Sequence, residues 1–214
     1  MSVVQEISEF LQKGRAKNVQ KLVQQALDEG IDPQVILNEG LLAGMMVVGA
    51  KFKREEVFVP DVLVAARAMN MGIEVLAPKL AAAGNEPVGK AVIGTVKGDL
   101  HDIGKNLVSM MLKGAGLEIY DLGVDVEATT FIQKAEEIGA DIICMSALLT
   151  TTMPYMKDVI DLLEEKELRE KYVVMVGGAP VTEKFAREIG ADYYTADATS
   201  AAEVAKSVVL KEAS

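Results

Sequence analysis

The chain has 214 residues, half of them hydrophobic, with 22 basic and 32 acidic side chains and a formal charge of −10. This composition indicates one or two folded domains, and the acidic balance argues against general nucleic-acid binding. One Cys and one His exclude an internal disulfide, a Cys-based zinc site and a multi-histidine cluster. The chain start lacks a signal-peptide pattern, and the longest apolar stretch, 41–50, is too short to span a membrane, so a cytoplasmic protein is expected.

The first 84 residues have the hydrophobic periodicity of helices. Asp32 and Pro33 are of the types that favour an N-cap and a first helical position. The helix that follows, about 33–51, is apolar on nearly all sides and is expected at the centre of a bundle. A further helix begins near Pro60. Short connections between these helices predict a small four-helix bundle.

A second domain follows a break in this pattern. Residues 85–89 are predicted to be a linker between domains at 1–84 and 90–214. Beyond it, five β–α repeats predict a doubly wound, five-stranded parallel sheet of the flavodoxin-like or Rossmann-like type. Most of the excess negative charge lies here, either as a solvated surface or as a docking site for a basic partner. Strands are expected at 91–96, 117–121, 141–146, 172–176 and 192–194, and helices at 103–115, 127–138, 153–168, 181–189 and 199–210.

The only histidine lies in a loop where such sheets bind ligands. Ligands bind beyond the carboxyl ends of the strands, which selects the loops 97–104, 146–152 and 177–180. Alone, His101 would cap a helix or face solvent. Asp99, two residues earlier, can accept a hydrogen bond from one ring nitrogen and leave the other free as a base or metal ligand. A single His fits a metal whose other ligands come from a macrocycle such as haem or corrin.

Glycines and hydroxyl residues in the same loops allow two interpretations each. Gly177-Gly178 forms either a tight turn or a close approach to a ligand, with helix N–H groups facing a phosphate. Ser146, Thr150, Thr151 and Thr152 either cap a helix or line a slot for a flat or chain-like ligand group. The residues by themselves leave both choices open.

Taken together, these loops resemble a known signature. Asp99-x-His101-x-x-Gly104, followed by Ser146-x-Leu148 and Gly177-Gly178, is similar in order and spacing to the cobalamin-binding signature. Phe52 with the segment 57–60 resembles the end of the helical cap module that precedes this domain in methionine synthase. The resemblance spans nearly the whole chain, and it extends to the free-standing corrinoid proteins of methyltransferase systems.

The resemblance implies a cobalamin or related cobamide bound base-off and His-on. His101 would be the lower ligand of cobalt, and Asp99 its hydrogen-bonded carboxylate. A serine that completes a His-Asp-Ser relay in methionine synthase corresponds to Thr152, whose rotamer is more restricted. Phe52 and Val59 would cover the upper corrin face. The implied relay is His101, Asp99 and Thr152, and the implied cofactor contacts are Gly98, Asp99, His101, Asp102, Ile103, Gly104, Ser146, Leu148, Thr150, Gly177, Gly178, Phe52 and Val59.

The implied function is that of a methyl carrier in one-carbon metabolism, without enzyme activity of its own. Cobalt(I) would accept a methyl group from a substrate-specific methyltransferase, and a second methyltransferase would pass it to tetrahydrofolate or coenzyme M. A reductive activase is a third implied partner, and neither nucleic acid nor a membrane is expected. The cap would move aside for transfer, with 84–89 as the hinge. The alternatives are a cobalamin-dependent sensor or regulator, the small subunit of a mutase, and a plain α/β domain without corrinoid, which leaves the Asp99–His101 pair unexplained.

Overall fold

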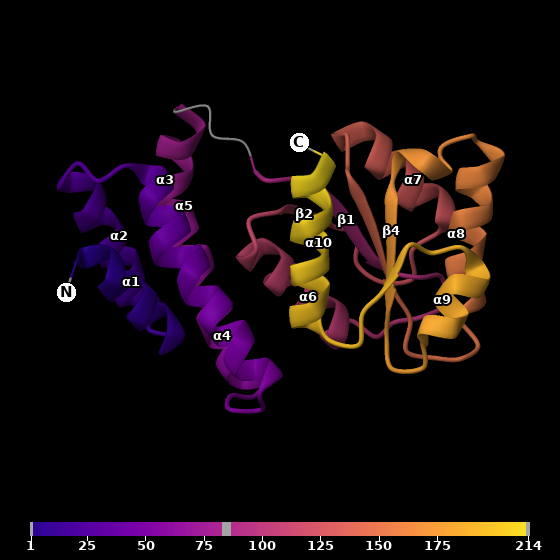
Figure 1. Ribbon diagram of the computed structural model, residues 1–214, viewed down its shortest axis with the longest axis horizontal. Coiled ribbons are helices and arrows are strands. Elements are labelled where there is room, and N and C mark those ends of the chain that lie inside the picture. The colour runs from indigo at the N-terminus through magenta and orange to yellow at the C-terminus, as the bar shows by residue number, and fades with distance from the viewer. Residues whose placement is uncertain (1, 83–86, 213–214) are drawn as a thin grey trace. The chain divides into compact units, whose positions relative to one another are not determined.

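The computed structural model describes residues 2–82 and 87–212, which form two compact units (Figure 1). One unit comprises Met1–Glu86 with Gly114–Gly116, and the other Pro87–Lys113 with Leu117–Ser214. Within the predicted linker 85–89, Asn85 and Glu86 lie outside the described residues. The carbonyl of Gly89 accepts a hydrogen bond from the N–H of Glu118 at 2.9 Å, so this glycine is already tied to the sheet.

The described part of the first unit contains four helices, because three helical segments run without a break over Pro33–Lys53. Ser2 and Gln5 form a capping box at the first helix. The Asp32 carboxylate accepts a hydrogen bond from the N–H of Gln34 at 2.7 Å, and Pro33 takes the first helical position, as predicted. The helices are α1 (Val3–Gln12), α2 (Ala16–Asp28), α3 (Pro33–Val35), the π-helix η1 (Ile36–Leu42), α4 (Ala43–Lys53) and α5 (Val59–Ala82).

Two glycines one turn apart let the long helix approach α1 closely. A Cβ atom on Gly40 would lie 3.1 Å from Cγ2 of Ile7, and one on Gly44 would lie 3.1 Å from the carbonyl oxygen of Ser8. Larger residues at either position would push the two helices apart. The spacing of these glycines therefore fixes how the core of this unit is packed.

The expectation that helix 33–51 lies wholly at the bundle centre is wrong in part. Met46 and Val47 are 58% and 39% exposed, whereas Met45 and Val48 are buried. The π-helix η1 precedes them, and its i→i+5 hydrogen bonds widen the turn. Helix α4 packs against α1 and α5 on one side, so its apolar residues on the other side are exposed.

By length and composition, the helix Pro33–Lys53 is long and apolar enough to cross a membrane, which the shorter stretch 41–50 did not predict. A core helix of a globular protein meets the same criteria. Ile36, Leu41 and Met45 are buried within this unit, and Gly40 packs against α1. These contacts are those of a core helix.

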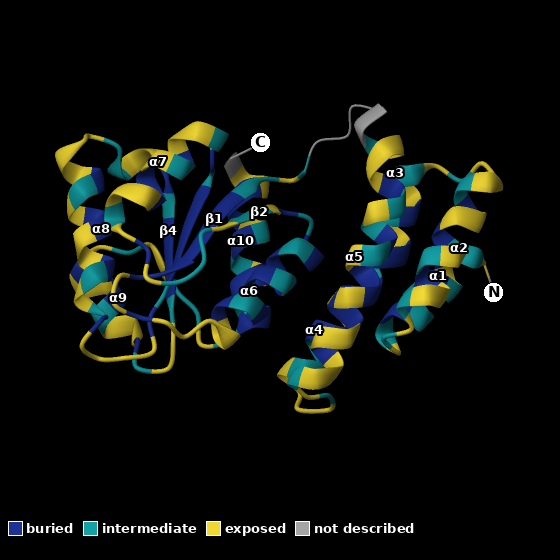
Figure 2. Ribbon diagram, turned by 180° about the vertical axis from the view of Figure 1, so that it is seen from behind, coloured by how far each residue is buried: buried dark blue, intermediate teal, exposed yellow. Residues whose placement is uncertain are grey.

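The second unit confirms the predicted fold class. Its five parallel strands have the order β2-β1-β3-β4-β5, so the winding reverses between β1 and β3. Helices α7, α8 and α9 cover one face of the sheet, and α6 and α10 cover the other (Figure 1). The strands are mostly buried, while the helices expose their outer faces (Figure 2). The elements are β1 (Lys90–Thr95), α6 (Ile103–Gly114), β2 (Glu118–Asp121), α7 (Ala128–Ile138), β3 (Ile142–Ser146), α8 (Pro154–Glu165), the 3-10 helix η2 (Arg169–Lys171), β4 (Val173–Gly177), α9 (Glu183–Ile189), β5 (Tyr193–Tyr194) and α10 (Ala198–Glu212).

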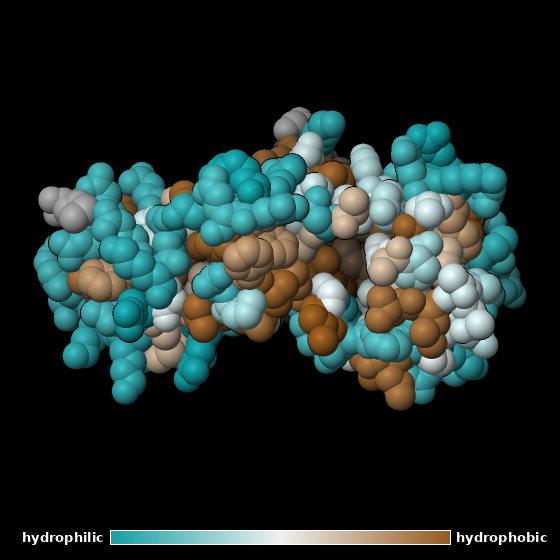
Figure 3. Space-filling model, turned by 90° about the horizontal axis from the view of Figure 1, so that it is seen from below, coloured by the Kyte–Doolittle hydropathy of each residue, from teal (hydrophilic) through white to brown (hydrophobic). Residues whose placement is uncertain are grey.

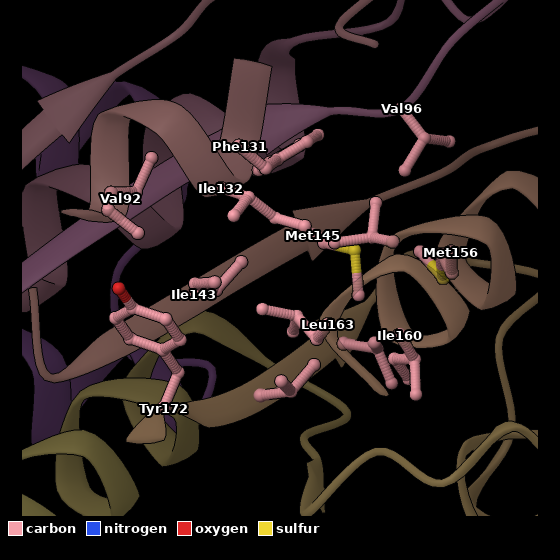
Figure 4. Packing of buried hydrophobic residues seen from close by; sticks show 14 of the residues in the cluster. Val92, Val96, Phe131, Ile132, Ile143, Met145, Met156, Ile160, Leu163 and Tyr172 are labelled. Carbon is pink, nitrogen blue, oxygen red and sulfur yellow. The ribbon is translucent and has the colours of Figure 1, made fainter. Parts of the chain in front are cut away.

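The core under α7 and α8 is apolar except for one hydroxyl. Phe131 and Ile143 are fully buried there, and Tyr172 is 2% exposed at the start of β4 (Figure 4). The Tyr172 hydroxyl is buried and has no hydrogen-bond partner among the described residues. An unsatisfied buried hydroxyl lowers the free energy of unfolding.

Tyr172→Phe is therefore expected to raise the free energy of unfolding by about 1 kcal/mol. Denaturant unfolding of the cofactor-free protein measures this. Tyr120→Phe is the matched control, because it removes the exposed hydrogen bond from the Tyr120 hydroxyl to Glu118 and should change stability by less than about 0.5 kcal/mol. A clear loss of stability in Tyr172→Phe would contradict the assignment.

Candidate functional site

The loops selected from the sequence meet at one edge of the sheet. Strands β1 and β3 are neighbours, with Thr95 paired to Ser146, and β3 is next to β4, with Ser146 paired to Gly177. Each loop begins where its strand ends. The winding of the sheet reverses between β1 and β3, which is where such folds bind ligands.

Asp99 lies at the centre of this edge. Its carboxylate is fully buried, in the loop between β1 and α6. One oxygen, Oδ1, lies 2.8 Å from Nδ1 of His101 and also accepts a hydrogen bond from the His101 backbone N–H at 3.1 Å. The carboxylate thus holds both the main chain and the ring of His101.

The second oxygen of Asp99 binds the loop that follows β3. It accepts hydrogen bonds from the N–H of Leu148 at 2.7 Å and from that of Leu149 at 3.2 Å. The Thr152 hydroxyl lies 2.8 Å from the same oxygen and 2.9 Å from the Leu149 carbonyl oxygen, and its single proton is best placed on the charged carboxylate. Asp99 therefore joins the loops of two neighbouring strands.

The buried carboxylate remains ionised. Burial acts to raise the pKa of Asp99, but the hydrogen bonds from the Leu148 and His101 backbones, the Thr152 hydroxyl and the His101 ring outweigh it. The pKa is held well below its usual range. Asp99 can consequently only accept hydrogen bonds, never donate one, at neutral pH.

This fixes the protonation pattern of His101. Because Asp99 is an acceptor, the proton of the neutral ring must lie on Nδ1, which leaves a lone pair on Nε2. Nε2 has no hydrogen-bond partner among the described residues, and the side chain is 51% exposed. The ring is also anchored through its main chain, since the His101 carbonyl oxygen accepts a hydrogen bond from the Thr95 hydroxyl at 2.9 Å. The arrangement presents one free imidazole nitrogen at the sheet edge.

The fold requires glycine at Gly178 but not at Gly104. A Cβ on Gly178 would lie 1.9 Å from the carbonyl oxygen of Ala147, and φ is +132° there, so the chain itself requires glycine. The interpretation of a phosphate facing helix N–H groups at Gly177-Gly178 does not fit, because α9 begins only at Glu183. Gly104 is the opposite case, since a Cβ there would meet no atom within 4 Å.

Hydrophobic side chains surround His101 on the surface. They form an exposed apolar rim at the end of the sheet toward which the strands run, and Figure 3 shows hydrophobic groups on the corresponding side of this unit. Large apolar groups left in water are informative because they mark binding surfaces. The apolar rim consists of Leu100 (71% exposed), Ile103 (77%), Leu148 (43%) and Leu149 (41%).

The remaining predicted residues lie at differing depths. Ser146 is half-buried at the end of β3, whereas Gly98, Asp102 and Thr150 are exposed. Asp102 accepts a hydrogen bond from the Asn106 side chain at 3.0 Å, within the first turn of α6. Two further predicted residues belong to the helical unit, where Phe52 lies in the last turn of α4 and Val59 begins α5, and both are half-buried.

Apart from His101, the described residues offer no group suited to bind a metal ion. Burial raises the pKa of the Cys144 thiol to about 12, so this residue of β3 stays a neutral thiol within the core. Among residues 2–82 and 87–212, no three His, Cys, Asp or Glu side chains gather as a metal-ligand group.

Several residues that shape the site were not predicted from the sequence. Lys105, 2% exposed at the start of α6, forms an ion pair with Asp121 at the end of β2 at 2.5 Å. Asp125, in the loop after β2, accepts a hydrogen bond from the Gly98 N–H at 2.7 Å. The sequence does not predict that the loop after β2 belongs to the site, because chain order does not reveal that β2 pairs with β1. The available signal was the pair Asp121 and Asp125, each two residues from Gly123 at a strand end.

Comparison with known proteins agrees over both units. A family model described as a B12 binding domain matches residues 89–205, and a second model of that description matches residues 3–77. A corrinoid protein of Desulfitobacterium hafniense (strain Y51) is 44% identical over 214 residues, 99% of each chain. A dimethylamine corrinoid protein of Methanosarcina acetivorans is 44% identical over 208 residues, 97% of each chain. The solved methanol:cobalamin methyltransferase complex of Methanosarcina barkeri gives a TM-score of 0.89 at 30% identity, covering 97% of this chain and 80% of that one.

Asp99→Asn is expected to lower the free energy of unfolding of the cofactor-free protein by about 2 kcal/mol. Both Asp99 oxygens accept hydrogen bonds, so the amide NH₂ would lie against either the His101 donors or the Leu148 and Thr152 donors. The folded-state pKa of Asp99 is depressed, so its stabilisation is present above the ordinary carboxyl range and is lost as the pH falls. The difference between variant and wild type should therefore shrink below about pH 4.

Denaturant unfolding at several pH values, with hydrogen exchange at the Leu148 and Leu149 amides, measures both effects. Asp102→Asn is the matched control on the same loop, since Asp102 is exposed. It should change stability by less than about 0.5 kcal/mol. Equal losses in the two variants, or unchanged exchange at Leu148 in Asp99→Asn, would show that Asp99 does not hold the loops together.

Proposed function

The chain belongs to the B12-binding corrinoid proteins of methyltransferase systems, and we propose from this premise that it carries a methyl group between two methyltransferases. The observation that carries the proposal is the free Nε2 of His101, with its tautomer fixed by a buried Asp99 at the switch point of the sheet. A bound corrinoid supplies the cobalt that holds the methyl group. The protein supplies one ligand, its orientation and a surface that fits the macrocycle.

The residues at the sheet edge fit such a cofactor. The half-exposed ring of His101 stands within the apolar rim, which matches a large and mostly apolar macrocycle. Gly104 leaves open space beside it, where any side chain would project. The nucleotide tail is assigned to the edge between the loops after β3 and β4, past Ser146 and Gly177, with Gly178 shaping that edge through its contact with Ala147.

In this proposal, Nε2 of His101 would hold the cobalt, in the base-off, His-on form. Asp99 keeps the Nδ1 proton in place and stabilises the imidazolium when the ring is released and takes a proton. Thr152 and the Leu148 N–H hold Asp99, so they act on cobalt only through the carboxylate. Phe52 and Val59 are assigned to the upper face of the corrin, which rests on the resemblance of the cap module.

The partners follow from the relatives. One relative is named a dimethylamine corrinoid protein, and a solved neighbour is a methanol:cobalamin methyltransferase complex. We infer that a substrate-specific methyltransferase for a methylated amine or alcohol loads this chain, and that a second enzyme unloads it to a folate or to coenzyme M. A reductive activase completes the cytoplasmic system. Relatives that match from end to end support the carrier over the sensor and the mutase subunit.

The direct test is methyl uptake. The reduced protein, reconstituted with cobalamin, is incubated with a panel of methyltransferases and labelled methylated amines or methanol. About one methyl group per chain should be bound by the loaded protein and none by the cofactor-free protein. Failure of every donor to label a correctly loaded protein would overturn the carrier role.

His101→Ala should still bind cobalamin, at least about tenfold more weakly, and in the base-off form. Absorption spectra of the cobalt(III) state in the dark, and affinity from titration, report the two effects. Added imidazole should restore the wild-type spectrum, because it replaces the missing nitrogen. An absorption spectrum unchanged from wild type would remove His101 as the cobalt ligand.

Gly104→Leu tests the open space in the same site. A Cβ at this position meets no neighbour, and leucine favours the helix that begins here, so stability of the cofactor-free protein should be unchanged or slightly raised. The affinity for cobalamin should fall by about tenfold or more if the cofactor occupies that space. Gly104→Ala is the control and should lose less. Full affinity in Gly104→Leu would place the cofactor elsewhere.

A further inference from the structure

The loop after β2 runs alongside the loop that carries His101. The Thr95 N–H donates a hydrogen bond to the Gly123 carbonyl oxygen at 3.0 Å, and the Val126 N–H donates one to the Thr95 carbonyl oxygen at 3.0 Å. Lys97 and Glu127 form an exposed ion pair at 2.9 Å. The segment 122–127 therefore supports the β1–α6 loop from the side opposite to β3.

Within this segment, Asp125 forms hydrogen bonds with the two peptide groups that flank the residue pair Gly98–Asp99. Its side-chain Oδ1 accepts a hydrogen bond from the Gly98 N–H at 2.7 Å, and its backbone N–H donates one to the Asp99 carbonyl oxygen at 3.0 Å. These two contacts bracket the residue pair from which the Asp99 side chain projects. The loop after β3 forms hydrogen bonds with the Asp99 carboxylate, and the loop after β2 forms one with the Asp99 main chain.

The backbone of Asp125 shows why an acidic or amide residue suits this position. Its φ is +55°, a left-handed conformation that Asp and Asn tolerate better than most residues, and it faces Gly98, whose φ is +75°. The side chain is exposed and lies outside the apolar core. Core packing therefore does not explain an acidic residue here, whereas its hydrogen bonds with the Gly98 N–H and the Asp99 carbonyl oxygen do.

We propose that Asp125 is a positioning residue for the Asp99–His101 pair, an inference that rests on the proposed function of His101 as cobalt ligand. Asp99 must place one oxygen on the His101 ring and the other on Leu148 and Thr152. The carboxylate can form both sets of hydrogen bonds only when the backbone of Asp99 is held in one position. Asp125 fixes that backbone and so helps to hold the His101 ring in the orientation that presents Nε2.

The first experiment needs no cofactor. Because His101 is the only histidine, a two-bond proton–nitrogen spectrum of ¹⁵N-histidine-labelled protein reads its tautomer without assignment ambiguity. The wild type should show the proton on Nδ1. Asp125→Gly keeps the left-handed backbone and the N–H but removes the acceptor, and it should show a mixed, rapidly exchanging tautomer. Asp125→Asn keeps an acceptor and should resemble the wild type.

Glu127→Gln is the matched control, because it breaks the ion pair with Lys97 on the same segment without touching the Gly98–Asp99 peptide. It should leave the tautomer unchanged. Should Asp125→Gly fail to fold, Asp125→Ala, which also lacks a side-chain acceptor, takes its place in every measurement. A wild-type tautomer in the acceptor-less variant, or an equal disturbance in Glu127→Gln, would overturn the proposal.

The second experiment measures cobalamin affinity and the fraction of His-on cobalt(III) by absorption. Asp125→Gly should bind about five- to tenfold more weakly, the effect of one hydrogen bond to a carboxylate, with a larger base-off fraction. Asp125→Asn should lose at most about twofold, and a loss equal to that of glycine would overturn positioning by a hydrogen bond. Absence of cobalamin binding in the wild type would instead refute the proposed function, while the tautomer measurement would still decide the role of Asp125.

Discussion

The site is organised by one buried carboxylate that must have every hydrogen bond satisfied. An ionised Asp99 without partners in the interior would cost several kcal/mol, so the loops around it are arranged to supply donors. Those donors come from His101 on one side and from Leu148, Leu149 and Thr152 on the other. The geometry of the β1–β3 edge and the tautomer of His101 are thereby set by the same group.

Much of this edge could be predicted from the sequence because its causes are local or follow from the sheet rule. Asp99 and His101 are two residues apart, and Thr152 follows a strand whose buried run identifies it as central. Asp125 could not be predicted, because its importance depends on β2 pairing with β1, and chain order does not specify that neighbour. The exposure of Met46 and Val47 could not be predicted either, since a helix that is apolar on nearly all sides gives no periodic signal for the side that packs.

The glycines show how a shared motif can hide different physical causes. From the sequence, the resemblance made both Gly104 and Gly178 contacts of the cofactor, although Gly177-Gly178 alone could also form a tight turn. In the structure, the Ala147 carbonyl oxygen lies where a Cβ atom of residue 178 would be, and the register of β3 against β4 sets this contact. Gly104 has no such neighbour. A glycine that the fold requires says little about a ligand, whereas a glycine that the fold does not require leaves its space available to one.

The role proposed for His101, a half-exposed histidine that would bind a large ligand, makes opposing demands on the side chain. The ring must stay accessible on the side where the ligand would bind, so no protein atom can contact it there. A side chain without other contacts would, however, lose conformational entropy on binding. All restraint must therefore come from beneath and beside the ring. Asp99 provides it from beneath, the Thr95 hydroxyl holds the His101 carbonyl, and the loop after β2 holds the Asp99 main chain. In the proposed role, one histidine would suffice because its supporting contacts, and not additional ligands, determine where its nitrogen points.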